Sequence, residues 1–394
     1  MAFQHEITLL LRSTGTKIDV WDGYAIVLDL TKAGNPWTFR FWYSSSDQRT
    51  AWETLKREVK IGDQVVLAID RACQLNGPIK ARHIGGNREG AYMEISGTDV
   101  AGNAIDWDAD PKIALRGVPL EEAFEKLLEP LGIPLVIGAN ADAAREIPSR
   151  QRPGSRGQSS TRTRRRHRID YSHPRPGEHV WQVMESIAKR LGYMLWVAPS
   201  ASGELAIVID APNYEQEPAY SFVRRIRNGV ATPESNILDG ALNEDIRSVP
   251  TTVYGIAYSP RGDEQPARIR VPYVNEELAR FPSVLNPLPV QPRYLHGSQA
   301  KTPAQARQSA SRMMSDAMAQ WRTYDCTVQG HGQPIKGETR LYALNTMCKV
   351  YDNIPSIDEE MLIQRIEFKG SRSAGQTTHL TLGTKGSIVL DPES

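Results

Sequence analysis

The sequence is poor in cysteine: its 394 residues include only Cys73, Cys326 and Cys348. So few cysteines, spaced so far apart, exclude a disulfide framework and a thiolate metal site. They are typical of a chain that folds in a reducing cytosol. A bridge between Cys326 and Cys348, on neighbouring predicted strands, is left open.

Long apolar runs and an excess of one charge are also missing. No run approaches the ~18 residues of a membrane-spanning helix, so no membrane insertion is expected. Residues 1–11 lack the basic and apolar regions of a signal peptide. With 47 basic and 46 acidic residues, the net charge of +1 gives no argument for a nucleic-acid or membrane surface.

Catalytic and metal-binding motifs are absent as well. The histidines show no metal-ligand spacing, and no metalloprotease or nucleophile-elbow motif occurs. Asp106, Asp108 and Asp110 alternate, but they lack the glycine and distal glutamate of an EF-hand, which favours an acidic loop over a cation site. His331 lies between two glycines without a nucleophile beside it in the sequence. We therefore expect no enzyme activity, no cofactor and no metal.

Residues 1–112 consist of short strand patterns separated by turn residues. Trp37–Tyr43 alternates with a period of two, and Asn76-Gly77 is a strong hairpin signal. This spacing favours a small β-barrel over a parallel sheet. Tryptophans in this region are better explained by core and strand packing than by ligand stacking; they are Trp37, Trp42 and Trp52.

Residues 113–212 contain one helix–strand pattern twice. Ala123–Ile137 aligns without gaps on Val183–Val197. Gly132 and Gly192 stand where left-handed helix C-caps are expected. This repeat predicts either two small α/β lobes in tandem or one lobe made of two copies.

An arginine-rich segment, residues 149–168, lies between the two copies and has no apolar residue to anchor it. It is either a solvated surface loop or a contact for a polyanion or an acidic partner. The lack of aromatic residues before Tyr171 argues against a platform for stacked single-stranded bases. The candidate contacts are Arg162, Arg164, Arg165, Arg166 and Arg168.

A long helix is predicted over Pro303–Trp321. Thr302 and Pro303 are typical of a helix start, and apolar residues then recur at three- and four-residue steps. We expect the apolar face, which includes Met313 and Met314, to pack on its own barrel. The polar face supplies candidate contacts to a neighbouring subunit or to a tail tube, namely Arg307, Arg312, Asp316 and Gln320.

A second β-barrel is predicted over residues 213–382. Its strands after the helix are expected to pair with Thr251–Tyr258 and close the barrel. Residues 236–246 fit a strand or a loop equally well. Residues 260–292 are predicted to form a long excursion from the barrel, and residues 383–394 are predicted to form a loose tail. The predicted fold class is α+β, mainly β, with two tube-type β-barrel domains and inserted small α/β lobes. The strands after the helix are Tyr324–Val328, Thr346–Tyr351, Met361–Lys369 and Thr377–Leu382.

The order and spacing of these segments resemble the baseplate hub proteins of contractile-tailed phages and related injection machines, in particular the Mu-like baseplate protein P and late-control tail protein D families. Val59–Val65 with Ile69-Asp70 is similar to the family's Gly-Asp-x-Val strand, and Ile95–Asp99 to its Gly-Arg-Asp strand end, with threonine replacing arginine. Residues 149–168 and 260–292 depart from the family. Further similar segments are Leu120–Ile137, Val180–Val197, Tyr324–His331, Leu344–Asp352, Leu362–Phe368 and Thr381–Gly383.

The resemblance implies a homotrimer in which each chain gives two similar barrels to a pseudo-hexameric ring. That ring would join a hexameric tail tube to a trimeric central spike and let genomic DNA pass. The implied partners are the spike, the tail tube or tube initiator, the tape measure protein and the baseplate wedge proteins. The implied location is the virion tail baseplate, after assembly in the host cytoplasm.

Two other functions stay open from the residues alone. One is a cell-wall glycan-binding or hydrolase module of a tail, with Asp108 or Glu94 as candidate acids. The other is a nucleic-acid-binding protein that uses the arginine-rich segment.

Overall fold

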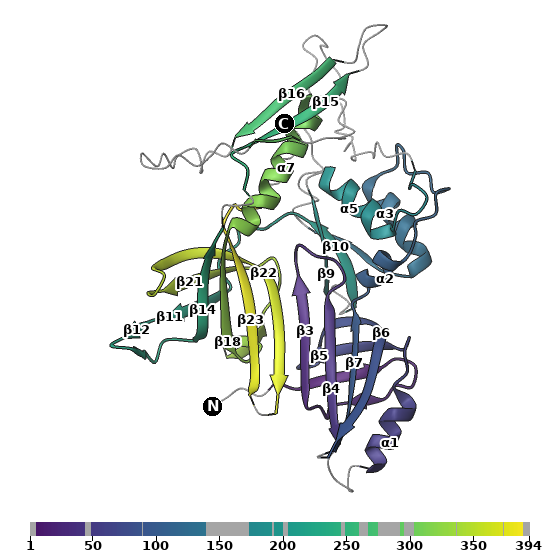
Figure 1. The fold of residues 1–394 in the computed structure, drawn as a ribbon, viewed down its shortest axis with the longest axis vertical. Helices are drawn as coiled ribbons and strands as arrows, with labels where there is room; N and C mark the ends of the chain where they lie inside the picture. The colour runs from purple at the N-terminus through teal and green to yellow at the C-terminus, as the bar shows by residue number, and fades with distance from the viewer. Residues whose placement is uncertain are drawn as a thin grey trace, which may run out of the picture.

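The computed structural model describes residues 5–43, 49–88, 90–138, 173–190, 193–199, 204–245, 249–259, 267–274, 292–294, 303–335, 337–372 and 374–388. The fold is α+β and mainly β, as predicted. Two β units lie side by side, with an α/β lobe and a projecting helix-and-sheet module at one end (Figure 1). None of the described helices is long and apolar enough to cross a membrane.

The N-terminal β unit contains most elements up to residue 106. Alternation in β4 buries Trp37, Phe39 and Phe41 in the core. The short helix α1 was not predicted, although Trp52 and Leu55 at three-residue spacing were a signal for it. The elements are β1 (Ile7–Leu11), β2 (Lys17–Ile18), β3 (Gly23–Asp29), β4 (Pro36–Tyr43), α1 (Arg49–Glu58), β5 (Gln64–Ile69), β6 (Ala72–Asn87), β7 (Gly90–Thr98) and α2 (Ala101–Asp106).

The hairpin predicted at Asn76-Gly77 is wrong. Both residues lie inside the 16-residue strand β6, and the turn between β5 and β6 falls at Asp70 and Arg71, with φ of 49° and 69°. Gly77 is needed for another reason. A Cβ there would come within 2.0 Å of the Thr98 carbonyl oxygen, so the backbones of β6 and β7 approach too closely for a side chain.

The α/β lobe combines both copies of the helix–strand repeat. Its sheet has the order β8-β10-β9, so the two copies flank one central strand in one lobe. Gly132 adopts the expected left-handed conformation, with φ of 61°, while residue 192 lies outside the described residues. The elements are α3 (Leu120–Leu128), a 3₁₀ turn (Glu129–Leu131), β8 (Leu135–Ile137), α5 (Val180–Arg190), β9 (Met194–Pro199) and β10 (Leu205–Asp210).

The C-terminal β unit contains the strands predicted after the long helix. Residues 237–244 form a strand, which settles the choice left open for residues 236–246. A parallel pair, β11 with β21, is held by the buried side chains of Arg224 and Asp352, whose Nη2 and Oδ2 atoms lie 2.6 Å apart. The elements are β11 (Tyr220–Arg224), β12 (Ile226–Arg227), β13 (Val230–Ala231), β14 (Ile237–Glu244), β18 (Arg322–Gln329), β19 (Gly332–Ile335), β20 (Glu338–Leu341), β21 (Met347–Asp352), β22 (Ile357–Ser371) and β23 (Gly375–Thr384).

The long helix α7 spans Pro303–Trp321, as predicted, but its apolar face packs elsewhere than expected. Strand β15 (Thr252–Ser259) pairs with β16 (Ala267–Val274) and β17 (Pro292–Tyr294), in a separate sheet outside the C-terminal β unit. Met314 and Ala310 pack against Val253 of this sheet. The predictions that this strand closes the second barrel and that α7 packs on that barrel are therefore wrong.

The close fit of α7 explains the correction. A Cβ on Gly255 of β15 would come within 2.0 Å of the carbonyl oxygen of Ala306 on α7. A bare glycine therefore lets the helix backbone lie directly on this small sheet. The end of α7 reaches the rest of the core, where Ala319 joins a cluster with Met347 and Leu362.

The end of the chain is more ordered than expected. Residues 383 and 384 complete β23, and Ile388 is buried, with its N–H donating to the Tyr214 hydroxyl oxygen over 2.9 Å. Residues 389–394 lie outside the described residues. Of the predicted excursion, residues 267–274 form β16, and residues 275–291 lie outside the described residues.

Candidate assembly site at the seam of the two β units

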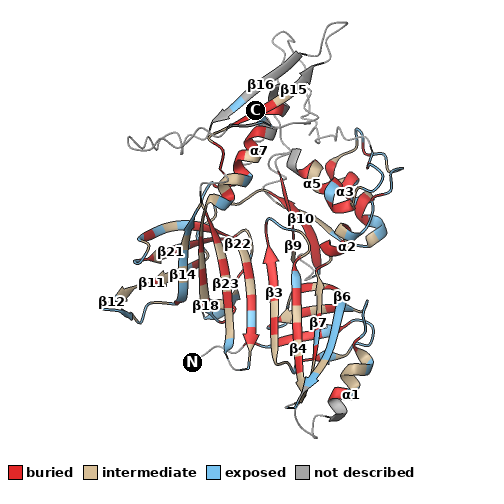
Figure 2. Ribbon diagram, viewed as in Figure 1, coloured by how far each residue is buried: buried red, intermediate tan, exposed pale blue. Residues whose placement is uncertain are grey.

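The two β units are joined edge to edge. Strand β3, near the start of the chain, pairs antiparallel with β22, near its end, from Gly23↔Ser371 to Asp29↔Arg365. We call this pair the seam. It fuses the units into one sheet, and buried residues run through both units (Figure 2).

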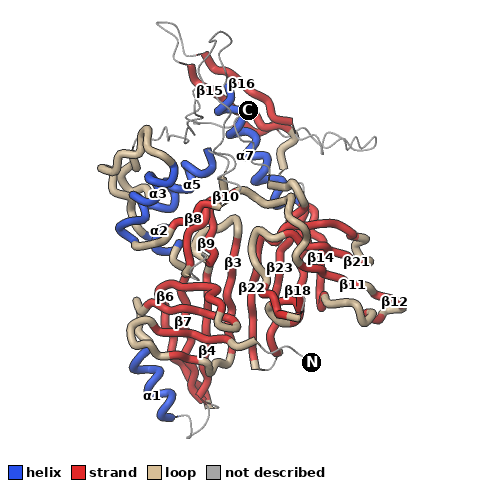
Figure 3. Tube along the Cα trace, turned by 180° about the vertical axis from the view of Figure 1, so that it is seen from behind, coloured by secondary structure: helices blue, strands red, loops and turns tan. Residues whose placement is uncertain are grey.

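Eight strands run across the seam in one continuous row, here called the seam sheet. Their order is β14, β18, β23, β22, β3, β4, β7 and β6, and every neighbouring pair is antiparallel. Both views of the chain show these strands side by side (Figures 1 and 3). Because side chains alternate along strands, one face of this sheet is core and the other is polar.

The polar face of the seam sheet carries charge of both signs. Asp325 accepts hydrogen bonds from the Asn243 amide and the Thr381 hydroxyl, each 2.6 Å long. Lys369 and Glu367 form an ion pair at 3.0 Å. Dispersed charges engaged with local partners make a weak site for a polyanion. The charged residues on this face are Asp29, Glu94, Asp239, Asp325 and Glu367, with Arg40, Arg365 and Lys369.

An aromatic and cation stack lies on the same face. Trp42 and Tyr92 stack with their ring planes 1° apart, and the Arg40 guanidinium carbon lies 4.7 Å from the Tyr92 ring centre. Trp37 and Trp52 are buried in the core instead. The three tryptophans therefore do not form one ligand-stacking set, in agreement with the packing interpretation.

A buried polar cluster closes the lower end of the seam, and its hydrogen bonds identify the tautomer of His331. The Thr378 hydroxyl donates to the Gly330 carbonyl oxygen over 2.6 Å, so its oxygen must accept from His331 Nδ1–H at 2.9 Å. His331 Nε2 then accepts from the Tyr24 hydroxyl at 2.6 Å. The neutral ring is fully satisfied, and a second proton on Nε2 would displace the hydrogen bond that Tyr24 donates.

His5 extends the cluster across the two units. Its Nε2 accepts from the backbone N–H of His331 at 2.9 Å, so its Nδ1 carries the proton and donates to Asp70 Oδ2 at 2.6 Å. The Gln376 side chain also holds His5, accepting from its N–H over 2.7 Å and donating to its carbonyl oxygen over 2.8 Å. His5, just before the first strand, is thereby locked to the last strand of the chain.

Burial sets the ionisation of the cluster. His331 is fully buried, and loss of solvation, with His5 nearby, lowers its pKa from 6.5 to about 3. Burial raises the pKa of Tyr24 far above its usual value. Both groups are therefore neutral at physiological pH, and the cluster is a structural lock rather than an exposed acid–base pair.

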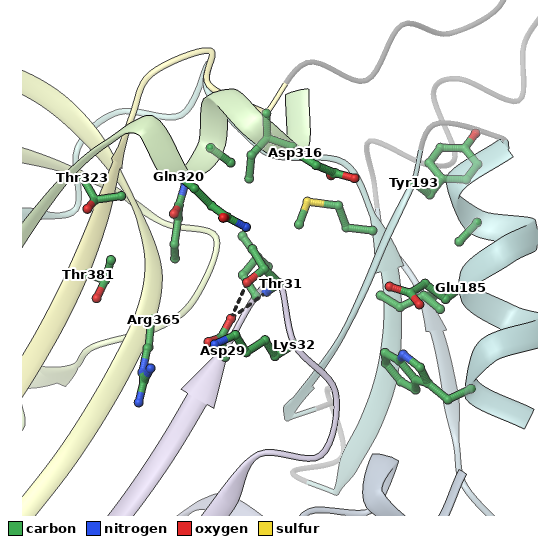
Figure 4. A pocket seen from close by; sticks show the side chains of 18 residues that line it. Asp29, Thr31, Lys32, Glu185, Tyr193, Asp316, Gln320, Thr323, Arg365 and Thr381 are labelled. Atoms are coloured by element: carbon green, nitrogen blue, oxygen red, sulfur yellow. Dashed lines mark hydrogen bonds between the residues drawn. The ribbon is translucent and has the colours of Figure 1, made fainter. Parts of the chain in front are cut away.

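Two of the candidate contact residues on α7 line a cavity of 530 Å³ at the upper end of the seam. Asp316 and Gln320 extend from α7 toward the end of β3, and Glu185 and Tyr193 lie on the opposite side (Figure 4). Thr31 donates to Asp29 there over 2.8 Å. Arg307 is exposed, and the side chain of Arg312 lies outside the described residues. Their role as contacts remains a prediction.

Other residues singled out by the sequence are not brought together. Asp106 pairs with Lys80, Asp108 Oδ1 lies 3.0 Å from His179 Nδ1, and Asp110 accepts from a backbone N–H. In the described part of the chain, no cluster of acidic residues, histidines or cysteines has metal-binding geometry. Cys326 and Cys348 are free. The arginine-rich segment, with Arg162, Arg164, Arg165, Arg166 and Arg168, lies outside the described residues.

No protein-family model matches the sequence, and no curated protein does. Solved structures do match. A tail protein from Neisseria meningitidis has 18% identity and a TM-score of 0.72, over 98% of each chain. A 43 kDa tail protein of prophage MuSo2 from Shewanella oneidensis has 16% identity and a TM-score of 0.73, over 98% of this chain and 100% of its own.

A third match is to a protein of E. coli described as a component of the type VI secretion system with structural similarity to T4 bacteriophage tail proteins gp27 and gp5. It has 11% identity and a TM-score of 0.50, over 98% of this chain and 79% of its own. At these identities the comparisons show a shared fold. The fold expected from the resemblance, that of phage tail and related injection-machine proteins, is therefore confirmed.

Proposed function

We propose that the protein is a structural component of a phage tail or a phage-derived injection particle, located in the baseplate. Its fold matches two tail proteins over nearly the whole of both chains. The similarity thus includes both β units, the α/β lobe and the α7 module, and the proposal concerns the whole chain.

The more specific role that we propose is a hub ring. Three copies would each contribute two β units, giving six similar positions to a hexameric tube on one side and three-fold symmetry to a spike on the other. The seam carries this proposal, because it holds two units of one chain side by side in a continuous sheet, as adjacent positions in a ring require. The further partners would be the tape measure and the baseplate wedges, in a virion tail assembled in the host cytoplasm.

Passage of genomic DNA fits the polar face of the seam sheet. Affinity for DNA comes mainly from lysine and arginine neutralising phosphates. This face has five acidic positions against the basic positions Arg40, Arg365 and Lys369, and Lys369 is paired with Glu367. A wall of this kind would let a duplex slide without holding it.

The proposed role is structural and not enzymatic. Asp108 and Glu94, the candidate acids for cell-wall hydrolysis, lie in different parts of the fold: Asp108 beside His179, and Glu94 on the polar face opposite Arg40. No observation on the described residues favours hydrolysis. A lytic assay on purified cell walls tests this point, and lysis by the purified protein would contradict the structural role.

The mass of the purified protein tests the ring. Each chain has a mass of 43.9 kDa, so light scattering or native mass spectrometry should give three times this value, alone or with its spike and tube neighbours. Electron micrographs of tails should then show a ring at the tube–spike junction. A monomer under all these conditions, together with tails that assemble normally without the protein, would contradict the proposal.

A further inference from the structure

The cavity at the upper end of the seam, here called the upper cavity, lies where three parts of the chain meet. Its walls are the upper end of the seam strands β3 and β22, the C-terminal part of α7, and α5 with the start of β9 in the α/β lobe (Figure 4). Its volume of 530 Å³ lies within the range of about 300–1,000 Å³ that is usual for binding sites. The polar groups in its walls therefore determine what it can bind.

A β-bulge in β22 places Gln364 in the wall of the upper cavity. The register between β22 and β23 shifts between Ile363 and Arg365, so Gln364 is an extra residue, and its carbonyl oxygen accepts from the Leu30 N–H over 2.8 Å. A bulge turns one side chain away from the regular alternation of a strand. Gly383 makes room for that side chain, because a Cβ there would overlap the Gln364 amide nitrogen.

Three polar groups in this wall are incompletely paired. Gln364 is 5% exposed, yet its Nε2 makes no hydrogen bond with the described residues, and neither does the buried Nε of Arg365. Asp29 is 6% exposed and accepts both hydrogen bonds from Thr31 at Oδ1, which leaves Oδ2 without a donor in the described part of the chain. Buried polar groups of this kind destabilise a fold unless another molecule pairs with them.

These groups match the hydrogen-bonding pattern of a peptide backbone. The primary amide of Gln364 both donates and accepts, so it can pair with a peptide C=O and N–H. The Arg365 guanidinium only donates and suits a carbonyl oxygen, whereas the Asp29 carboxylate only accepts and suits an N–H. A sugar also offers donors and acceptors, but Trp181 and Tyr193, the aromatic residues of the lining, are buried and present no open ring face to it. The lining thus favours a peptide.

The charge of the lining favours a basic side chain in that peptide. Three carboxylates line the cavity, on Asp29, Glu185 and Asp316, against the cations of Lys32 and Arg365. Figure 4 shows Asp316 on α7 and Glu185 on α5, both away from Arg365. A peptide bound along the seam side would point a lysine or arginine side chain toward these two carboxylates. The aliphatic stem of that side chain would lie along the apolar part of the lining.

We propose that the upper cavity binds an extended segment of a partner protein that carries a lysine or arginine. The segment's backbone pairs with Gln364, Arg365 and Asp29, and its basic side chain lies toward Asp316 and Glu185. A bound segment contacts the seam, α7 and the α/β lobe together, so it would tie the projecting α7 module to the lobe. One chain supplies the whole lining, so this inference does not depend on the hub ring or on the number of copies.

Defined small ligands test the site on the full chain. The main probe is the tripeptide Gly-Arg-Gly with an acetylated N-terminus and an amidated C-terminus. The readout is the Met194 ε-methyl signal in NMR spectra, because Met194 lines the cavity. Gly-Arg-Gly should shift this signal saturably, with a Kd in the millimolar range for so small a ligand. The signal of Met93, buried in the N-terminal β unit, should not move.

Two further probes define the chemistry of recognition. Gly-Glu-Gly, blocked in the same way, reverses the charge of the side chain. Agmatine carries the guanidinium on an aliphatic stem without any peptide bond. Each should bind at least about five-fold more weakly than Gly-Arg-Gly, because each loses one of the two kinds of contact.

Variants connect the binding to the named groups. Gln364→Met keeps a side chain of similar length and removes the amide, and Arg365→Met removes the guanidinium. Each should weaken the binding of Gly-Arg-Gly about five-fold, the effect of one lost hydrogen bond. Lys369→Met, at an exposed position of the same strand outside the cavity, is the matched control and should bind as the wild type does. An unchanged Met93 signal shows that each variant is folded.

The outcomes decide this inference separately from the proposed function. Saturable binding of Gly-Arg-Gly that weakens in Gln364→Met and Arg365→Met supports the peptide site. A Met194 signal that Gly-Arg-Gly leaves in place, or equal affinity in the two variants and the wild type, overturns it. Equal binding of agmatine overturns the recognition of peptide, and equal binding of Gly-Glu-Gly overturns the preference for a basic side chain. None of these results bears on the trimeric hub, which the mass of the assembly tests.

Discussion

The backbone N–H of His331 donates to Nε2 of His5 over 2.9 Å, although the two residues stand near opposite ends of the chain. This bond and its neighbours hold the two β units together below the seam. Because the donors and acceptors determine both histidine tautomers, the lock should be sensitive to changes in protonation and in packing.

Acid should weaken the fold through His331. Its pKa is about 3 in the folded chain and 6.5 in the reference state, so between these values the unfolded chain binds the additional proton. The stability contribution is complete above pH 6.5 and is lost as pH falls toward 3, by about 2 kcal/mol at pH 5. Urea unfolding at pH 7 and pH 5 should show this loss as the difference between the wild type and His331→Gln. The half-exposed His379→Gln serves as the control, and a loss that persists in His331→Gln would contradict the assignment.

Asp99 should act in the opposite sense. Burial raises the pKa of this carboxyl from 3.8 to about 6, so the folded chain binds its proton first and gains stability as pH falls from 6 toward 4. Between pH 7 and pH 5 the gain is about 1 kcal/mol. The variant Asp99→Asn should lose this gain, so its stability should not rise relative to pH 7 on acidification. A variant with the wild-type pH profile would show that Asp99 does not titrate in this range.

Gly370 should be intolerant of any side chain. A Cβ at this position would lie 2.3 Å from Tyr24 Cε1, so Gly370→Ala must displace a buried ring of the histidine lock and should cost about 1–3 kcal/mol. Gly23, on the partner strand of the seam, is the matched control, because its nearest contact is an ordinary 3.5 Å. Thermal unfolding should separate Gly370→Ala from Gly23→Ala, and equal melting temperatures would argue against the tight seam.

Removing one partner of the buried ion pair in the C-terminal β unit should be strongly destabilising. Asp352 is fully buried and accepts from Arg224 and from the Tyr324 hydroxyl. Asp352→Asn leaves Arg224 without its counter-charge and should cost about 3–5 kcal/mol. Asp358→Asn breaks an exposed pair with Lys349 and should cost well under about 1 kcal/mol. Chemical denaturation measures the free energy of unfolding of both variants. Similar losses of stability in Asp352→Asn and Asp358→Asn would contradict the difference expected between a buried and an exposed ion pair.

The polar face of α7 should contribute to assembly. Reversal of charge by Arg312→Asp together with Asp316→Arg should weaken binding to a neighbouring subunit or to the tube at least about ten-fold, because like charges would then meet across the interface. Arg307 and Gln320 share this predicted role. Arg227→Glu, on the exposed strand β12, is the control. Binding to purified tube protein measures the effect, and unchanged assembly would count against these contacts.

Local patterns in the sequence predicted much of the secondary structure. The helix over Pro303–Trp321 and the strands of the second β unit were readable because apolar residues repeat with the period of one element, whatever that element packs against. The helix–strand repeat was readable for the same reason. The Asn76-Gly77 pair led to a wrong hairpin prediction, because glycine occurs where two backbones approach closely as well as in turns.

What the sequence by itself determined is the type of most elements and, through their order, the family that the chain resembles. What only the tertiary structure decided is which elements meet: α7 lies on its own small sheet, and β3 pairs with β22 across the length of the chain. The physical reason is that periodicity specifies which face of a strand is buried. It does not specify which edge receives a partner, since any unpaired backbone offers the same hydrogen bonds.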